Sequence, residues 1–229
     1  MDFDMRLNPK TPKTFQEHAL PEHARLAGYA AIVHALAVKA PVRRLSCVSE
    51  KHIRGSQRAE PRWIVFDRRY WPGDTFGDHL SFALRHERMD LLILKRTFEA
   101  VVANEMADFV RAAPNGIPNR RGWFLYELLT GRKLKVPDAR NVTATDILDR
   151  AAYFTGEPRL SRRHRVRDNL LGTGRFCPVI RRTKTLTDFI ARDLATKARE
   201  TVGRTGAHLV VRAARFMLLA DSRASFEIE

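Results

Sequence analysis

Apolar residues recur at helical spacing through most of the first 135 positions of this 229-residue chain. They predict an amphipathic helix over residues 21–39, which Pro41 stops. Further short helices are expected to begin at four residues that favour helix starts: Asp74, Asp90, Asn104 and Pro118. Gly131 ends the last and most apolar of them. The pattern therefore predicts one compact helical module over residues 21–135.

Only one segment has the composition of a β-strand. Residues 62–67, Arg-Trp-Ile-Val-Phe-Asp, are rich in β-branched and aromatic types, and a Pro-Gly-Asp turn follows at residues 72–74. The basic residues 41–61 before it show no regular period. The fold class predicted is therefore mainly α, with a compact helical module, one short strand or hairpin, a long loop-rich basic segment and C-terminal helices.

The second half of the chain has a different pattern. Prolines and glycines interrupt residues 136–185 and little periodicity remains, so we expect a loop-rich basic linker there. A helix is predicted from Thr185 or Thr187 to Thr201, and a last helix begins near Ala207. With a polar, flexible arm at the N-terminus, the chain is expected to have four segments: 1–20, 21–135, 136–185 and 186–229.

The charge of the chain is strongly basic, since 41 Lys and Arg against 26 Asp and Glu give a net charge of +15. Eight Arg and one Lys lie between residues 159 and 184, where Asp168 is the single acid. Such a one-sided run could follow a phosphate backbone. The candidate nucleic-acid-binding residues are Arg162, Arg163, Arg165, Arg167, Arg181 and Arg182. The alternative is that these arginines pair with acids on the helical module or on another domain.

Other chemistry is weakly indicated. Cys47 and Cys177 have no spacing typical of a metal site or a disulfide framework, and His79 and His86 lie seven positions apart without a third ligand, so no metal is predicted. No stretch of about 18 apolar residues predicts a membrane span, and the first residues do not resemble a secretion signal. We expect a cytoplasmic setting.

Four segments give a more specific indication. They are residues 45–52 (Leu-Ser-Cys-Val-Ser-Glu-Lys-His), 123–131 (Trp-Phe-Leu-Tyr-Glu-Leu-Leu-Thr-Gly), 162–170 (Arg-Arg-His-Arg-Val-Arg-Asp-Asn-Leu) and 222–229 (Ser-Arg-Ala-Ser-Phe-Glu-Ile-Glu). Together they resemble the N-terminal region of long bacterial proteins of the Fic (Fido) AMP-transferase family. The last segment matches the family's inhibitory helix, whose signature is Ser or Thr, three residues, Glu, then Gly or Asn. Ser225 and Glu229 are present, and the following Gly is not.

The resemblance implies a regulatory role for Ser225 and Glu229. In this family the Glu pairs with the second Arg of the catalytic loop and occupies the space that the ATP γ-phosphate needs. Glu229 would be that carboxylate, and Ser225 the small polar residue one helical turn earlier. An anion is required because only an anion can neutralise a phosphate-binding guanidinium through two parallel contacts. The alternative is an exposed helix end that contains Ser and Glu by coincidence.

The catalytic signature of the family, His-Pro-Phe-x-Asp/Glu-Gly-Asn-Gly-Arg, occurs nowhere in the chain, because none of its eight histidines precedes a Pro. We therefore expect no catalytic residues, no enzymatic activity and no cofactor in this chain. ATP with Mg is implied only for a catalytic domain outside it. The expected partner is such a Fic catalytic domain, in cis in a longer protein of which this chain is a truncated or cut form, or in trans. A basic nucleic-acid-binding module is the alternative function.

Overall fold

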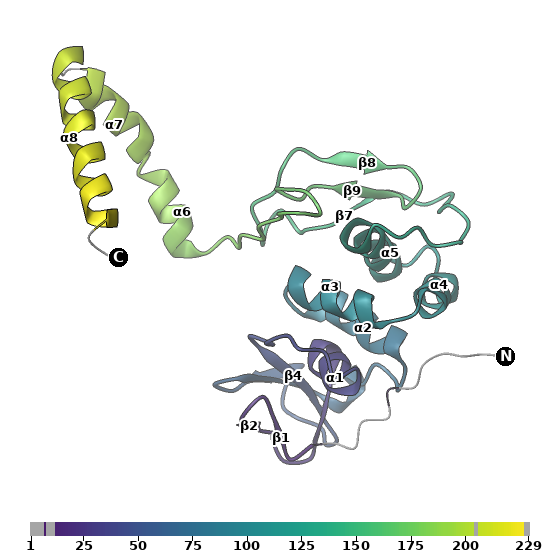
Figure 1. The fold of residues 1–229 in the computed structure, drawn as a ribbon. Coiled ribbons are helices and arrows are strands. Elements are labelled where there is room, and N and C mark those ends of the chain that lie inside the picture. Colours follow the sequence, from purple (N-terminus) through teal and green to yellow (C-terminus); the bar gives the residue numbers. More distant parts are fainter. Residues whose placement is uncertain (1–6, 8–11, 204–205, 227–229) are drawn as a thin grey trace. The chain divides into compact units, whose positions relative to one another are not determined.

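The computed structural model describes residues 7, 12–203 and 206–226, and the chain divides into two compact units, Met1–Ile180 and Arg181–Glu229. The first unit contains three sheets and several helices, and the described part of the second is helical (Figure 1). With 44% helix and 14% strand the fold is mixed α/β, so the prediction of a mainly α fold with one hairpin is wrong.

The largest sheet has four strands, of which only one was predicted. In spatial order they are β3 (Ala24–Leu26), β4 (Leu45–Ser49), β6 (Trp63–Phe66) and β5 (Gln57–Ala59). β4 and β6 are parallel, and the other two pairs are antiparallel. All five residues of β4 are buried, so the strand lacks the alternation of a half-exposed strand. Residues 41–61 therefore show no period in the sequence although they contain a central strand, whereas the strand predicted at residues 62–67 is confirmed.

The helix predicted over residues 21–39 is divided between a strand and a shorter helix. β3 ends at Leu26, Ala27 is extended, and α1 spans Gly28–Ala35. Gly28 begins the helix with φ of +57°, a conformation that glycine adopts without steric cost. Of the apolar residues that indicated one long helix, Leu26, Tyr29, Ala30 and Val33 are buried in these two elements, whereas Ala37 is exposed and lies after α1. The pattern therefore identified most of these core residues correctly and the element incorrectly.

A carboxylate from another helix caps the N-terminus of α1. Glu87, directly after α2 (Phe76–His86), accepts a hydrogen bond of 2.7 Å from the backbone N–H of Tyr29. The Oε1 atom of Glu87 is shut off from solvent. Burial raises the pKa of Glu87 to about 7, although the Ser46 hydroxyl and the Tyr29 amide favour the ionised form. A Cβ atom on Gly28 would lie 2.2 Å from Glu87 Oε2, so this contact requires glycine.

Four helices form the middle of the first unit. They are α2, α3 (Leu91–Ala100), α4 (Ala103–Ala112) and α5 (Ile117–Thr130). α5 packs against the other three, and α2 also packs against α1 (Figure 1). Two sequence signals are confirmed, since Asp90 caps α3 and Gly131 ends α5 in the left-handed conformation. The cap of α2 is Thr75 rather than Asp74, and Asp78 completes a reciprocal capping box.

Residues 136–180 form a packed layer beside α5 and not a linker. Their sheet has the order β7 (Thr145–Asp146), β9 (Val166–Asp168) and β8 (Arg159–Ser161). Arg120 of α5 is only 2% exposed and donates hydrogen bonds to the carbonyl oxygens of Thr143, at 3.0 Å, and Arg165. The buried guanidinium thus satisfies backbone groups of a segment that has little regular structure of its own. The segment is loop-rich, as predicted, but these contacts attach it to α5, so the interpretation as a linker was wrong.

The described part of the predicted N-terminal arm is also packed. β1 (Thr14–Phe15) and β2 (His18–Ala19) form a hairpin. The Ala19 carbonyl accepts a hydrogen bond of 2.9 Å from Trp63 Nε1, and the Gln16 side chain bonds to the Ala40 carbonyl at 2.8 Å. These contacts attach the hairpin to the four-stranded sheet and to the chain after α1.

The second unit contains α6 (Lys184–Ala191), α7 (Leu194–Gly203) and α8 (Ala207–Phe226). Thr183 caps α6, earlier than the predicted Thr185 or Thr187. The helix expected to continue to Thr201 is divided near Asp193, whose φ of 45° is left-handed and interrupts the helix. The last helix begins at Ala207, as predicted.

Candidate functional site

α8 contains the first of the two residues assigned a regulatory role. The Ser225 hydroxyl donates a hydrogen bond of 2.8 Å to the Asp221 carbonyl one turn earlier, a local contact common for serine inside helices. Ser225 is exposed, as are the other described side chains from Val211 onward. Glu229 lies outside the described residues. The structure therefore shows a helix leading into the motif.

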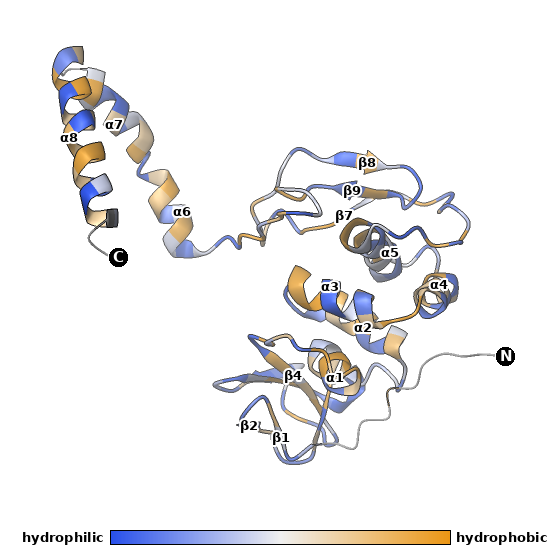
Figure 2. Cartoon of the chain, viewed as in Figure 1, coloured by the Kyte–Doolittle hydropathy of each residue, from blue (hydrophilic) through white to orange (hydrophobic). Residues whose placement is uncertain are grey.

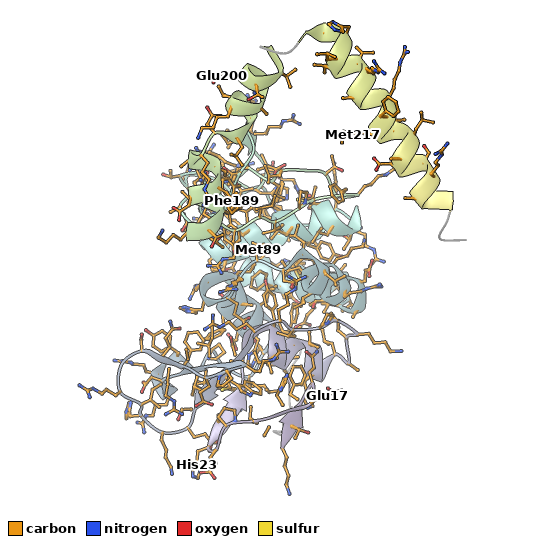
Figure 3. The ribbon with its side chains drawn as sticks, turned by 90° about the vertical axis from the view of Figure 1, so that its left-hand side faces the viewer. Glu17, His23, Met89, Phe189, Glu200 and Met217 are labelled. Carbon is orange, nitrogen blue, oxygen red and sulfur yellow. The ribbon has the colours of Figure 1, made fainter. Side chains whose placement is uncertain are left out.

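The apolar side chains of the second unit are exposed to an unusual degree. On α8, Phe216, Met217, Leu218 and Leu219 are 58–70% exposed. Figure 2 shows hydrophobic residues at many positions along α8, and Figure 3 labels Met217 on this helix. Four consecutive residues point to different sides of a helix, so no single polar face remains over this stretch. Exposed apolar surface of this kind is typical of a segment that another protein covers.

Arg163, one of the candidate nucleic-acid-binding residues, is held inside the first unit. Its guanidinium contacts the Glu127 carboxylate at 3.3 Å and the Asp138 carboxylate at 2.7 Å, and it donates to the Leu134 carbonyl at 2.6 Å. It also lies over the Trp123 ring, 4.8 Å from the ring centroid. A guanidinium with this many protein partners is positioned for structure and not for phosphate.

Glu127 is the centre of this arrangement, which we call the Glu127 network. One oxygen, Oε1, accepts hydrogen bonds from Trp123 Nε1 at 2.8 Å and from the Leu134 amide at 3.0 Å. The other, Oε2, lies 3.2 Å from Nε2 of the buried His164. Burial opposes ionisation of Glu127, but these hydrogen bonds and the charge of Arg163 hold its pKa below the ordinary value.

The Glu127 network orders Ser161, His164 and Glu127 in a line, because the Ser161 hydroxyl lies 2.7 Å from His164 Nδ1. Burial lowers the pKa of His164, so the imidazole is neutral at pH 7. Glu127 already has donors from Trp123, Leu134 and Arg163, and the Trp123 and Phe124 rings pack against the imidazole. The line joins the β8–β9 hairpin to α5, which is a structural role. The one signal of this network in the sequence is the spacing of Trp123 and Glu127, which lie one helical turn apart.

The remaining candidate arginines divide into two groups. Arg165 donates from Nε to the Val142 carbonyl at 3.0 Å, and Arg167 forms a short ion pair with Asp146. Arg162, Arg181 and Arg182 are exposed. Within the part of the chain that the structure describes, Arg162 and Arg181 form no ion pair with a carboxylate. The structure thus separates the run of arginines that looked continuous in the sequence.

The described residues contain neither a metal-binding cluster nor a membrane-spanning helix. No group of three or more His, Cys, Asp and Glu side chains among residues 7, 12–203 and 206–226 could hold a metal ion. No helix in those same ranges is long and apolar enough to cross a membrane.

Burial raises the pKa of Cys47 to about 12, so this thiol is not ionised at neutral pH.

Comparison of the chain with models of protein families, with curated proteins and with solved structures found no match.

Proposed function

We propose that this chain is the N-terminal, regulatory portion of a Fic-type protein, and that it restrains and positions an AMP-transferase catalytic domain in cis or in trans. The observation that supports this proposal is α8, a helix with exposed apolar side chains that leads directly into the Ser225 and Glu229 motif. A helix that must dock on a partner needs such a surface. Docking would bury Phe216, Met217 and Leu218.

The proposed restraint is electrostatic and steric. The Glu229 carboxylate would pair with a guanidinium that otherwise binds the ATP γ-phosphate, and it would thereby exclude the productive position of the triphosphate. Its placement must be accurate, since a displacement of about 1 Å is enough to weaken in-line geometry strongly. The exposed apolar residues of α8 would supply this accuracy by fixing the helix on its partner. ATP with Mg would belong to the catalytic domain, in a cytoplasmic setting.

We expect Glu229→Gly to abolish the restraint. The assay mixes the purified chain with a Fic-type catalytic domain that lacks an inhibitory helix, and measures transfer of AMP from labelled ATP. The unmodified chain should lower the transfer rate, and Glu229→Gly should restore it by roughly 10-fold to 100-fold, because a charge-assisted contact contributes about 1.5–3 kcal/mol.

Glu227→Gly is the matched control for this measurement. Residues two positions apart on a docked helix would face nearly opposite sides, so Glu227→Gly would remove the same charge without removing the proposed contact. Equal restoration by both variants would show a general charge effect. Failure of the unmodified chain to lower transfer, in trans or when fused before the catalytic domain, would contradict the proposal.

The alternative of nucleic-acid binding now depends on fewer residues, since Arg163, Arg165 and Arg167 bond within the first unit. If the exposed Arg162, Arg181 and Arg182 contact phosphates, the affinity for duplex DNA should fall with salt at a log–log slope of about −3. A mobility assay at two salt concentrations measures this slope. We expect no retention at physiological salt, and specific retention that Arg162→Ala weakens would favour the alternative.

A further inference from the structure

The first unit contains a pocket that neither the regulatory motif nor the Glu127 network uses. Its volume is about 380 Å³, within the lower part of the range for small-molecule sites. One wall comes from the 3₁₀ helix η1 (Arg68–Tyr70) and from Trp71 and Pro72, which follow it. The other wall is one face of α2, where the lining residues are spaced at three and four positions: Asp78, Ser81, Phe82 and Arg85.

Two guanidinium groups line this pocket. Arg69 is fixed by the buried carboxylate of Asp67, which lies 3.2 Å from its Nε, and its Nη2 donates to the Gly55 carbonyl at 3.3 Å. Arg85 is exposed on α2 and forms no ion pair with a carboxylate in the described portion of the chain. The one acid that lines the pocket, Asp78, is occupied in the capping box with Thr75. The pocket is therefore lined by two guanidinium groups and one carboxylate, and the N–H donors that a ligand could use come from the guanidinium groups.

The buried carboxylate of Asp67 fixes the backbone next to the pocket. Asp67 accepts hydrogen bonds from the Ile53 amide at 2.8 Å and from the Arg69 amide at 3.2 Å, and it lies 3.2 Å from His52 Nδ1. The Ile53 amide is the largest of the contacts that lower the pKa of Asp67 to about 2. Asp67 is thus ionised at any physiological pH, and it anchors the segment from which Arg69 extends.

Aromatic rings form the apolar part of the pocket. The His86 ring centroid lies 4.9 Å from that of Phe82 and 5.6 Å from that of Tyr70, and Trp71 lies alongside under the Arg25 guanidinium. Burial, with the charge of Arg85, lowers the pKa of His86, so this ring is neutral at pH 7. Neutral aromatic side chains beside two cations are the usual means of binding a planar ring that bears an anion.

We propose that this pocket binds a phosphate monoester attached to a planar base, of mononucleotide size. Arg85 and Arg69 would hold the phosphate with charge-assisted hydrogen bonds, and the Ser81 hydroxyl lies on the same wall. Tyr70 and His86 would pack against the base. Two sources share this chemistry, a free nucleotide and the 5′-phosphorylated end of a nucleic-acid strand. This inference is independent of the proposed role of α8.

The test is calorimetric titration of the full chain with 5′-AMP, adenosine, inorganic phosphate, and an oligonucleotide with and without a 5′-phosphate. We expect 5′-AMP to bind at least 10-fold more tightly than adenosine or inorganic phosphate. Arg85→Gln should weaken 5′-AMP binding at least 10-fold. Tyr70→Leu should weaken it roughly 10-fold through lost stacking. Tighter binding of the phosphorylated oligonucleotide than of 5′-AMP, with no binding of the unphosphorylated one, would identify the strand end as the source.

Arg132→Gln is the matched control, because Arg132 is an exposed arginine of the same unit that does not line the pocket. An equal loss of affinity in Arg85→Gln and Arg132→Gln would overturn the proposal, since the binding would then follow net charge. Binding of adenosine or inorganic phosphate as tight as that of 5′-AMP would also overturn it. So would the absence of any binding of 5′-AMP or the phosphorylated oligonucleotide at millimolar concentration. Circular dichroism verifies that each variant is folded.

Discussion

Glu127→Ala is expected to lower the free energy of unfolding of the first unit by about 3 kcal/mol, which corresponds to a fall of roughly 6–12 °C in Tm. The variant leaves the indole N–H of Trp123 and the amide N–H of Leu134 without their acceptor. It also removes one of the two carboxylates that compensate the Arg163 guanidinium. Buried donors without partners and uncompensated charges are among the costliest single defects in a folded protein. Thermal unfolding followed by circular dichroism measures the effect.

Glu157→Ala serves as the control for this loss, because Glu157 is an exposed carboxylate in the segment that the Glu127 network attaches. It should change Tm by no more than about 1 °C, as surface substitutions usually do. Glu127→Gln keeps one acceptor and should fall between the two. A Glu127→Ala protein with the Tm of the unmodified chain would show that residues 136–180 do not depend on this carboxylate.

The second large effect concerns pH. The pKa of Glu87 is raised to about 7 from an ordinary value of 4.5, so the folded state holds the proton more tightly than the unfolded state does. This contribution to stability is complete below pH 4.5 and is lost as the pH rises to 7 and beyond. Between pH 5 and pH 8, the loss amounts to about 3 kcal/mol at most, from 1.36 kcal/mol for each pKa unit.

Glu87→Gln isolates this effect. The amide oxygen can still accept the hydrogen bond from the Tyr29 amide, but the side chain has no proton to lose. We expect the variant to be less sensitive to pH than the unmodified chain, and more stable than it at pH 8. Denaturant unfolding at pH 5, 6, 7 and 8 gives the comparison. Parallel pH profiles of the two proteins would contradict burial of the Glu87 carboxylate.

The two carboxylates illustrate opposite effects of burial. Glu127 has hydrogen-bond donors on Oε1 and a cation beside it, so its pKa falls and acid removes its contribution. For Glu87, burial outweighs the hydrogen bond from the Tyr29 amide, so its pKa rises. Neither effect can be predicted from the sequence, because both depend on which groups the tertiary structure brings to the carboxylate.

Residue type was sufficient to predict an element where residues close in the sequence determine its structure. Asp90 accepts hydrogen bonds from amides two and three residues later, and Gly131 takes up the left-handed conformation that stops α5. Both interactions lie within one helical turn, so the residue type alone identifies them. The strand at Trp63–Phe66 was predicted for a similar reason, since β-branched and aromatic residues dominate it.

Prediction failed where distant segments determine the structure. β4 contains two serines and is buried on both faces by other elements, so its sequence shows neither alternation nor strong β-propensity. Residues 136–180 contain little regular secondary structure. Hydrogen bonds and ion pairs with Arg120 and with the Glu127 network of α5 hold them in place. In both cases, contacts between distant segments determine the structure, and the local sequence pattern does not reveal it.

The sequence by itself therefore determined the helix ends at Asp90 and Gly131, the strand at Trp63–Phe66, the basic charge and the terminal Ser225 and Glu229 motif, since these depend on residue type and short spacing. Only the tertiary structure decided which arginines are engaged in internal contacts, which carboxylate holds its proton, and that Arg69 and Arg85 line one pocket. Those properties arise from distance and solvent access between residues far apart in the chain, and a linear pattern contains neither.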